Sequence, residues 1–148
     1  MEYKYYSTVE DLTFLEKQRV VDFLHEHLEE YGDPKKDIKN AIDYALSPYP
    51  LAGGFVLTAE KDGSILGSVI MNKTGMKGYI PENILVYIAV HKDHRGEGIG
   101  KELMKECLKY AKGDIKLHVE PENPAKFLYE KFNFTNKYLE MRLNRNKK

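Results

Sequence analysis

The feature that most constrains the fold of this chain is an unbroken apolar run, residues 84–90, followed by a glycine-containing turn and an amphipathic helix. An apolar run without alternation is typical of a strand that is covered on both faces. The loop 91–97 leads into a predicted helix from about Gly98 to Lys112. Its apolar stripe comprises Ile99, Leu103, Met104, Cys107, Leu108 and Ala111. The segment therefore predicts a central strand, a tight turn and a helix that packs on the sheet.

The first half of the chain predicts one strand, two helices and a hairpin. Ser7 and Glu10 have the spacing of a capping box, which predicts that a helix starts there and runs to about Tyr31. A second helix is expected from Asp33-Pro34 to just before Pro48. Asp62-Gly63 between two β-prone runs predicts the hairpin. The expected strands are 3–6, 55–60 and 65–72, and the first helix is expected to bury Leu12, Leu15, Val20, Leu24 and Leu28.

In the second half, helices and strands alternate. Beyond the central strand we expect a strand at 115–119, a helix at 124–131 and a last strand at 138–143. Together these elements predict a mixed α/β (α+β) sheet with helices on both faces. No linker or repeat interrupts 1–148, so one domain is expected.

The composition and charge of the chain argue against two classes of partner, nucleic acid and membranes. It has 148 residues with 23 basic and 23 acidic side chains, and a neutral chain disfavours nucleic acid as a partner. The single cysteine, Cys107, excludes internal disulfides and is interpreted as a buried apolar residue. No apolar run reaches the roughly 20 residues of a membrane span. We therefore expect a cytoplasmic protein without a membrane or nucleic-acid partner.

The segment from Arg95 to Lys101 predicts a phosphate site. The first amides of a helix lack internal partners, and the helix dipole is positive at that end. Glycines let a phosphate approach the backbone closely. Arg95 and Lys101 are expected to add positive charge nearby.

Spacing distinguishes between phosphate-binding motifs. A P-loop requires Gly-Lys followed by Ser or Thr, but Glu102 follows here. The dinucleotide fingerprint requires Gly-x-Gly-x-x-Gly, and Gly96-x-Gly98-x-Gly100 is one residue too short. The spacing present is Arg-x-x-Gly-x-Gly.

This spacing resembles the coenzyme A signature of the GCN5-related N-acetyltransferases, Gln/Arg-x-x-Gly-x-Gly/Ala after a buried strand. Arg95, Gly98 and Gly100 match it, and Val90 closes the preceding strand at the usual distance. The resemblance implies a mixed, mostly antiparallel sheet of about six to seven strands with a splayed central pair. It implies an acceptor side at 1–50 and an acetyl-CoA-binding core at 53–143. The implied cofactor-binding residues are Ile88, Ala89, Val90, Arg95, Gly96, Glu97, Gly98, Ile99, Gly100 and Lys101.

A second segment, 123–134, is similar to the family's Asn-x-Ala…Tyr-Glu-Lys-x-Gly-Phe. Tyr129 stands where the family has a tyrosine aimed at the acetyl-CoA sulfur, so the resemblance implies that it protonates the departing thiolate. Asn123 either contacts the pantetheine arm or caps the helix. Asn133 replaces the usual glycine and tolerates a left-handed backbone.

The general base is the weakest part of the match. The family's glutamate position falls on Ile84, so Glu82 and Glu120 are the nearest carboxylates and Glu82 is the candidate catalytic residue. His118 is another candidate base. The remaining histidines show no metal-ligand grouping, so no metal is expected.

The resulting hypothesis is direct acetyl transfer from acetyl-CoA to the primary amine of a small molecule or a protein, by a monomer or homodimer. The alternative hypothesis is a non-catalytic acyl-CoA-binding sensor or interaction module. The missing glutamate favours this alternative, whereas Tyr129 favours catalysis.

Overall fold

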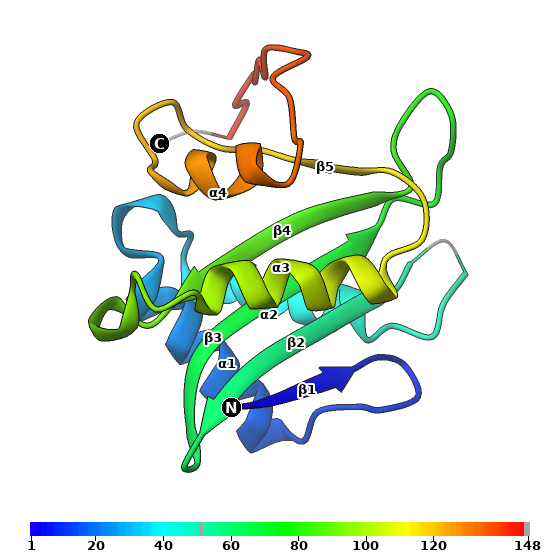
Figure 1. Cartoon of the computed structure of the whole chain (residues 1–148). Helices are drawn as coiled ribbons and strands as arrows, with labels where there is room; N and C mark the ends of the chain where they lie inside the picture. Colours follow the sequence, from blue (N-terminus) through cyan, green and yellow to red (C-terminus); the bar gives the residue numbers. More distant parts are fainter. Residues whose placement is uncertain (51, 147–148) are drawn as a thin grey trace. The chain divides into compact units, whose positions relative to one another are not determined.

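The computed structural model describes residues 1–50 and 52–146, and its framework is one mixed sheet of five strands (Figure 1). The strands lie in the order β1-β2-β3-β4-β5, and every neighbouring pair is antiparallel except β4–β5, which is parallel. Their bounds are β1 Glu2–Tyr6, β2 Gly54–Lys61, β3 Ser64–Lys73, β4 Asn83–Val90 and β5 Ile115–Leu117. The predicted mixed, mostly antiparallel sheet is confirmed.

The hairpin between β2 and β3 is confirmed at the predicted dipeptide. Asp62 has φ 52° and Gly63 has φ 81°, so both residues are left-handed, as a tight two-residue hairpin turn requires. Lys61 pairs with Ser64 across the turn. The turn therefore sets the register next to the hairpin, and a shift between Ala59 and Glu60 changes it along the rest of the pair.

Helices cover both faces of the sheet, as predicted. Figure 1 shows α3 in front of the sheet and α1 and α2 behind it. The helices and 3-10 turns before residue 118 are α1 Phe14–His27, η1 Glu29–Tyr31, α2 Lys35–Ala45, η2 Lys92–His94 and α3 Ile99–Tyr110. On the α1 and α2 side the core includes Val20, Leu24, Ile38 and Ile42, and on the α3 side Ile99, Leu103, Met104 and Cys107 are buried.

Gly67 on β3 seats α3 close to the sheet. A Cβ at this position would lie 2.5 Å from Leu103 Cδ1 and 3.1 Å from Ile99 Cγ2. Gly67 also pairs with Val90, the last residue of β4. The first turn of α3 is therefore packed against the point where β4 ends.

The chain forms two compact units, Met1–Leu117, which holds the sheet, and His118–Lys148. The second unit contains α4, Ala125–Lys131. Asn133 follows this helix with φ 69°, and the amides of Asn133 and Phe134 donate to the carbonyls of Glu130 and Tyr129. The prediction that Asn133 can replace glycine in a left-handed turn is confirmed.

Two predicted strand features are wrong. Residues 138–143 form no strand, so the described residues contain five strands instead of six to seven. In addition, β5 ends at Leu117 instead of residue 119. As a result β5 is an edge strand of this sheet. The splayed pair that we expected at the centre of the sheet, β4 and β5, lies at that edge. A strand needs a partner, and no pairing involves residues 138–143 in the described chain.

The first helix begins later than predicted. Ser7 accepts hydrogen bonds from the amides of Val9 and Glu10 and starts a turn. The capping box is formed by Thr13 and Glu16, whose side chains each accept from the other residue's backbone amide. Leu15, which was predicted to be buried, lies in the first turn of α1 and is exposed. Leu108 on α3 is also largely exposed.

We expect Thr13→Ala to lower the free energy of unfolding by about 1 kcal/mol, because it leaves an amide in the first turn of α1 without its side-chain acceptor. Ser7→Ala is the matched control and should cost less, since Ser7 caps no helix. Urea denaturation measures both variants. An equal or larger loss for Ser7→Ala would contradict this assignment of the cap.

Candidate active site

The parallel pairing of β4 with β5 is short, and this leaves most of β4 open along one edge. Asn83, Ile84 and Leu85 pair with residues 115–117, and the pairing ends there. A register shift between Ile70 and Met71 of β3 leaves Val86 as the extra residue on β4, immediately after Leu85. A bulge of this kind bends a strand and increases its twist. The predicted splayed pair is therefore β4 and β5: their pairing ends at Leu85, and Ile88, Ala89 and Val90 lie beyond it on β4.

The turn that follows β4 presents a row of open amides. None of the backbone N–H groups of residues 96–101 finds an acceptor among the described residues. Gly96 and Gly98 have φ 83° and 85°, a region that glycine adopts without strain. A Cβ built on either residue meets no atom within 4 Å, so the space above both glycines is open. The arrangement is suited to an anion at the N-terminus of α3.

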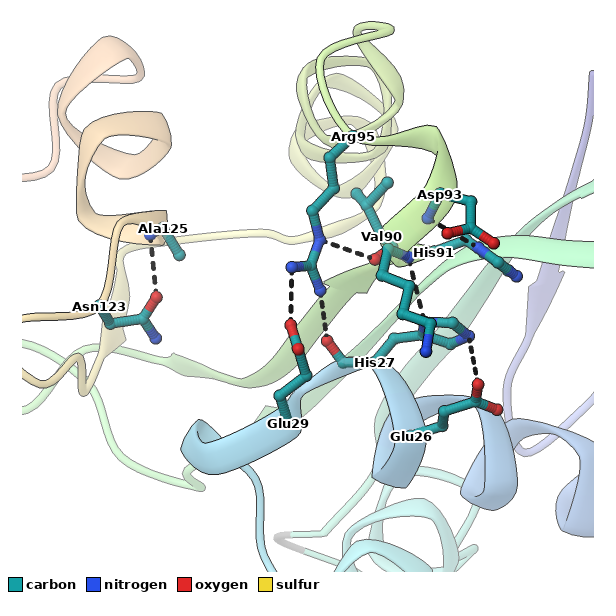
Figure 2. A network of polar contacts seen from close by, with 10 residues as sticks. Glu26, His27, Glu29, Val90, His91, Asp93, Arg95, Asn123 and Ala125 are labelled. Atoms are coloured by element: carbon teal, nitrogen blue, oxygen red, sulfur yellow. Dashed lines mark hydrogen bonds and ion pairs between the residues drawn. The ribbon is translucent and has the colours of Figure 1, made fainter.

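The two basic side chains of this turn have different surroundings. The Arg95 guanidinium donates to Glu29 Oε1 at 2.7 Å, to the His27 carbonyl at 2.7 Å and to the Val90 carbonyl at 3.4 Å (Figure 2). The same contact holds the pKa of the Glu29 carboxyl below its usual value. Lys101 is exposed and forms no ion pair within the described chain, and Glu97 is paired with His94 at 3.2 Å. Lys101 is therefore the side chain whose charge is available to an anion at the turn.

The second predicted segment holds Asn123 and Tyr129 in its own unit. Asn123 Oδ1 accepts from the Ala125 amide at 2.9 Å, which caps the start of α4 (Figure 2). Tyr129 is 8% exposed, and burial raises the pKa of its phenol to about 12. Its ring lies 6.0 Å from that of Phe134. The Tyr129 hydroxyl has no hydrogen-bond partner within the described residues, and it is not among the fully enclosed unpaired atoms.

Glu82 precedes β4, at the end of the strand opposite to Val90. Its Oε1 accepts from the Asp114 amide at 3.2 Å, and its carboxylate lies where a side chain on Gly113 would be. The structure thus places Glu82 as a brace of the turn between α3 and β5. Glu120 and His118 are exposed and belong to the second unit.

Sequence reasoning assigned no role in the site to Tyr87 or to its partner Asp33, which was expected only at the start of the second helix. Tyr87 follows the bulge residue Val86, and its hydroxyl donates to Asp33 Oδ2 in the loop between η1 and α2. Burial and the Asp33 carboxylate raise the pKa of Tyr87 well above its usual value, so it stays a hydrogen-bond donor. A phenol and a carboxylate brought together from distant segments leave no pattern in a single sequence.

Other groups are less suited to the chemistry. Cys107 is fully buried, and burial raises the pKa of its thiol to about 12, so the interpretation of Cys107 as a core residue is confirmed. The described residues contain no group of three or more His, Cys, Asp or Glu side chains that could hold a metal ion. No helix in the described part of the chain is long and apolar enough to cross a membrane. Two shallow hollows of about 350 and 380 Å³ include none of the predicted site residues in their lining.

Comparison with known proteins gives the family of the chain and, with it, the class of enzyme. The chain belongs to the acetyltransferase (GNAT) family, whose model matches residues 18–134. The predicted family is therefore confirmed, and the protein is an enzyme of the N-acetyltransferase class.

Two relatives and one solved structure illustrate the similarity. A protein of Pectobacterium atrosepticum described as an acetyltransferase is 31% identical over 112 residues, which are 72% of this chain and 71% of that protein. A Yersinia pestis protein described as an N-acetyltransferase is 31% identical over 122 residues, 77% of this chain and 78% of that protein. The structure of an aminoglycoside N-acetyltransferase in complex with CoA has a TM-score of 0.70 at 13% identity, covers 98% of this chain and 95% of its own, and shows the shared fold.

Proposed function

We propose that the protein transfers an acetyl group from acetyl-CoA directly to a primary amine. The observation that carries this proposal is the row of open amides from Gly96 to Lys101, with free space above two left-handed glycines. Backbone amides at a helix N-terminus bind a diphosphate through hydrogen bonds and the helix dipole. An aminoglycoside N-acetyltransferase of the same fold is known in complex with CoA, which supports the choice of ligand.

In this proposal β4 and the turn that follows it bind different parts of acetyl-CoA. The amides of residues 96–101 hold the diphosphate, assisted by the unpaired Lys101. The open edge of β4 at Ile88, Ala89 and Val90 pairs with the amides of the pantetheine arm, as an added strand would. When bound, acetyl-CoA supplies an activated thioester. The buried thiol of Cys107 is not a nucleophile, which agrees with transfer without an acetyl-cysteine.

Gly98→Ala should weaken CoA binding by about tenfold or more, because an alanine strains the left-handed backbone and places a Cβ in the open space above the amides. Gly63→Ala is the matched control, since Gly63 has φ 81° and equally open surroundings at the β2–β3 hairpin. Both variants should lose similar stability in urea, about 1–2 kcal/mol. Titration calorimetry with CoA separates them: equal affinities for the two variants would remove the diphosphate from this turn.

For Tyr129 we propose the role of proton donor to the departing sulfur. Charge builds on this sulfur as the amine attacks, and a phenol without another partner among the described residues can donate to it. The raised pKa keeps the phenol protonated throughout the range in which amines react. Asn123 keeps one amide group for the pantetheine arm, because its contact with Ala125 occupies only Oδ1.

Tyr129→Phe should lower kcat by about 10²-fold while CoA affinity stays unchanged, since only a hydrogen bond of the transition state is removed. Thiol release at saturating acetyl-CoA measures kcat, and calorimetry measures affinity. Because the pKa of Tyr129 is about 12, ionisation of this residue should not reduce kcat below about pH 10. Wild-type turnover in the phenylalanine variant would exclude Tyr129 as the acid.

The acceptor amine must lose a proton before it attacks, and we propose Asp33 as the group that takes it. Tyr87 holds Asp33 Oδ2 next to the bulge at Val86, and Oδ1 has no partner among the described residues. Glu82, which was the candidate base, has its carboxylate directed at the turn between α3 and β5. The position of Asp33 beside the diverging edge of β4 makes it the better placed carboxylate.

Asp33→Asn is therefore expected to lower kcat/KM for the amine by about 10²-fold near neutral pH, and less at higher pH where free amine is abundant. Glu82→Gln is the control: its amide oxygen still accepts from Asp114, so activity should stay near that of the wild type. An acceptor screen with acetyl-CoA supplies the amine for both assays. The reverse ranking of the two variants would return the role of base to Glu82.

A further inference from the structure

The C-terminal end of α1 holds the segment that leads into the turn of open amides (Figure 2). The Lys92 amide donates to His27 Nδ1 at 3.1 Å. Three residues later, Arg95 Nη2 donates to the His27 carbonyl at 2.7 Å. One residue of α1 thus accepts hydrogen bonds from both ends of the segment 92–95, and Gly96 follows immediately.

The side chain of His27 is enclosed and has a defined neutral form. It is 4% exposed, and its ring lies 4.6 Å from Phe23 and 4.1 Å from His91 between ring centroids. An imidazole that accepts at Nδ1 carries its proton on Nε2, and Nε2 lies 3.9 Å from Glu26 Oε2. A protonated imidazole has no acceptor, so only the neutral ring makes the bond to Lys92.

The charged groups around His27 favour this neutral form. Burial lowers the pKa of His27 most, followed by His91, while Glu26 acts in the opposite direction. Arg95 and Lys92, on the segment that packs against α1, lower it further. The imidazole is therefore kept as an acceptor at neutral pH by its own surroundings.

The backbone carbonyl of His27 makes the second contact with the segment 92–95. Carbonyls in the last turn of a helix have no partner within the helix, and the dipole is negative at this end. Arg95 satisfies the His27 carbonyl and extends to Glu29 in η1, which has a left-handed φ of 55°. Through these hydrogen bonds the Arg95 side chain links the turn after β4 to the C-terminal end of α1.

We propose that His27 is a positioning residue for CoA: its imidazole and carbonyl fix Lys92 and Arg95 so that the amides of residues 96–101 stay open toward the diphosphate. This inference rests on the proposed function, because it assigns a support to the same turn. His27 touches no ligand in this scheme and acts through the backbone that it holds.

Two substitutions separate the hydrogen bond from the packing of the ring. His27→Phe keeps an aromatic ring beside Phe23 and His91 but has no acceptor, whereas His27→Asn places an amide oxygen close to the position of Nδ1. At pH 8 we expect His27→Phe to weaken CoA binding about tenfold and to raise KM for acetyl-CoA by a similar factor, with little change in kcat. His27→Asn should restore binding to within about threefold of the wild type.

A third measurement uses the unmodified protein. Long-range ¹H–¹⁵N NMR correlations of the imidazole at pH 7 should show His27 neutral, with the proton on Nε2 and none on Nδ1. This measurement remains decisive if the phenylalanine variant does not fold.

The outcomes distinguish this inference from the proposed function. No CoA binding by the wild type at pH 8 would overturn the proposed function itself. Binding by the wild type together with equal affinity in His27→Phe, a loss in kcat instead of KM, or a proton on Nδ1 would each overturn the positioning role while leaving the CoA site in place.

Discussion

The rest of the site depends on the early separation of β4 from β5. Backbone N–H and C=O groups require partners, and β4 has β3 along one side throughout but β5 only as far as Leu85. The bulge at Val86 marks the point of separation. An edge that has lost its neighbouring strand inside a folded sheet is a template for an extended ligand, and a pantetheine arm with two amides satisfies that description.

The turn of open amides after β4 and the unpaired edge of β4 are held together by the packing of α3. Gly67 pairs with Val90 and, having no side chain, admits Ile99 and Leu103 of α3 against the sheet. The close packing places the start of α3 directly beyond the end of β4. In the proposed function, a ligand that pairs along β4 would therefore reach the open amides at the end of the same strand.

The parts of the fold that were predicted correctly are governed by local chemistry. The apolar run of β4, the hairpin at Asp62-Gly63 and the left-handed Asn133 each follow from residue type and spacing within a few positions. The predictions that failed required knowledge of a distant partner. Residues 138–143 lack a neighbouring strand, and Ser7 matched the capping pattern while Thr13 caps the helix. In the site, the contacts of Glu82 with Asp114, of Tyr87 with Asp33 and of Arg95 with Glu29 join segments that a single sequence cannot connect.

The contacts of Arg95 change the expected source of positive charge in the proposed diphosphate site. The sequence suggested that arginine supplies charge, but its guanidinium is neutralised by Glu29 and bonded to α1. Lys101 and the partial charge of the helix remain to attract the ligand. Binding by amides depends steeply on their direction, because a hydrogen bond weakens as it bends, whereas attraction between charges does not. A site of this kind therefore needs rigid support behind the turn, and the network around His27 lies where that support is required.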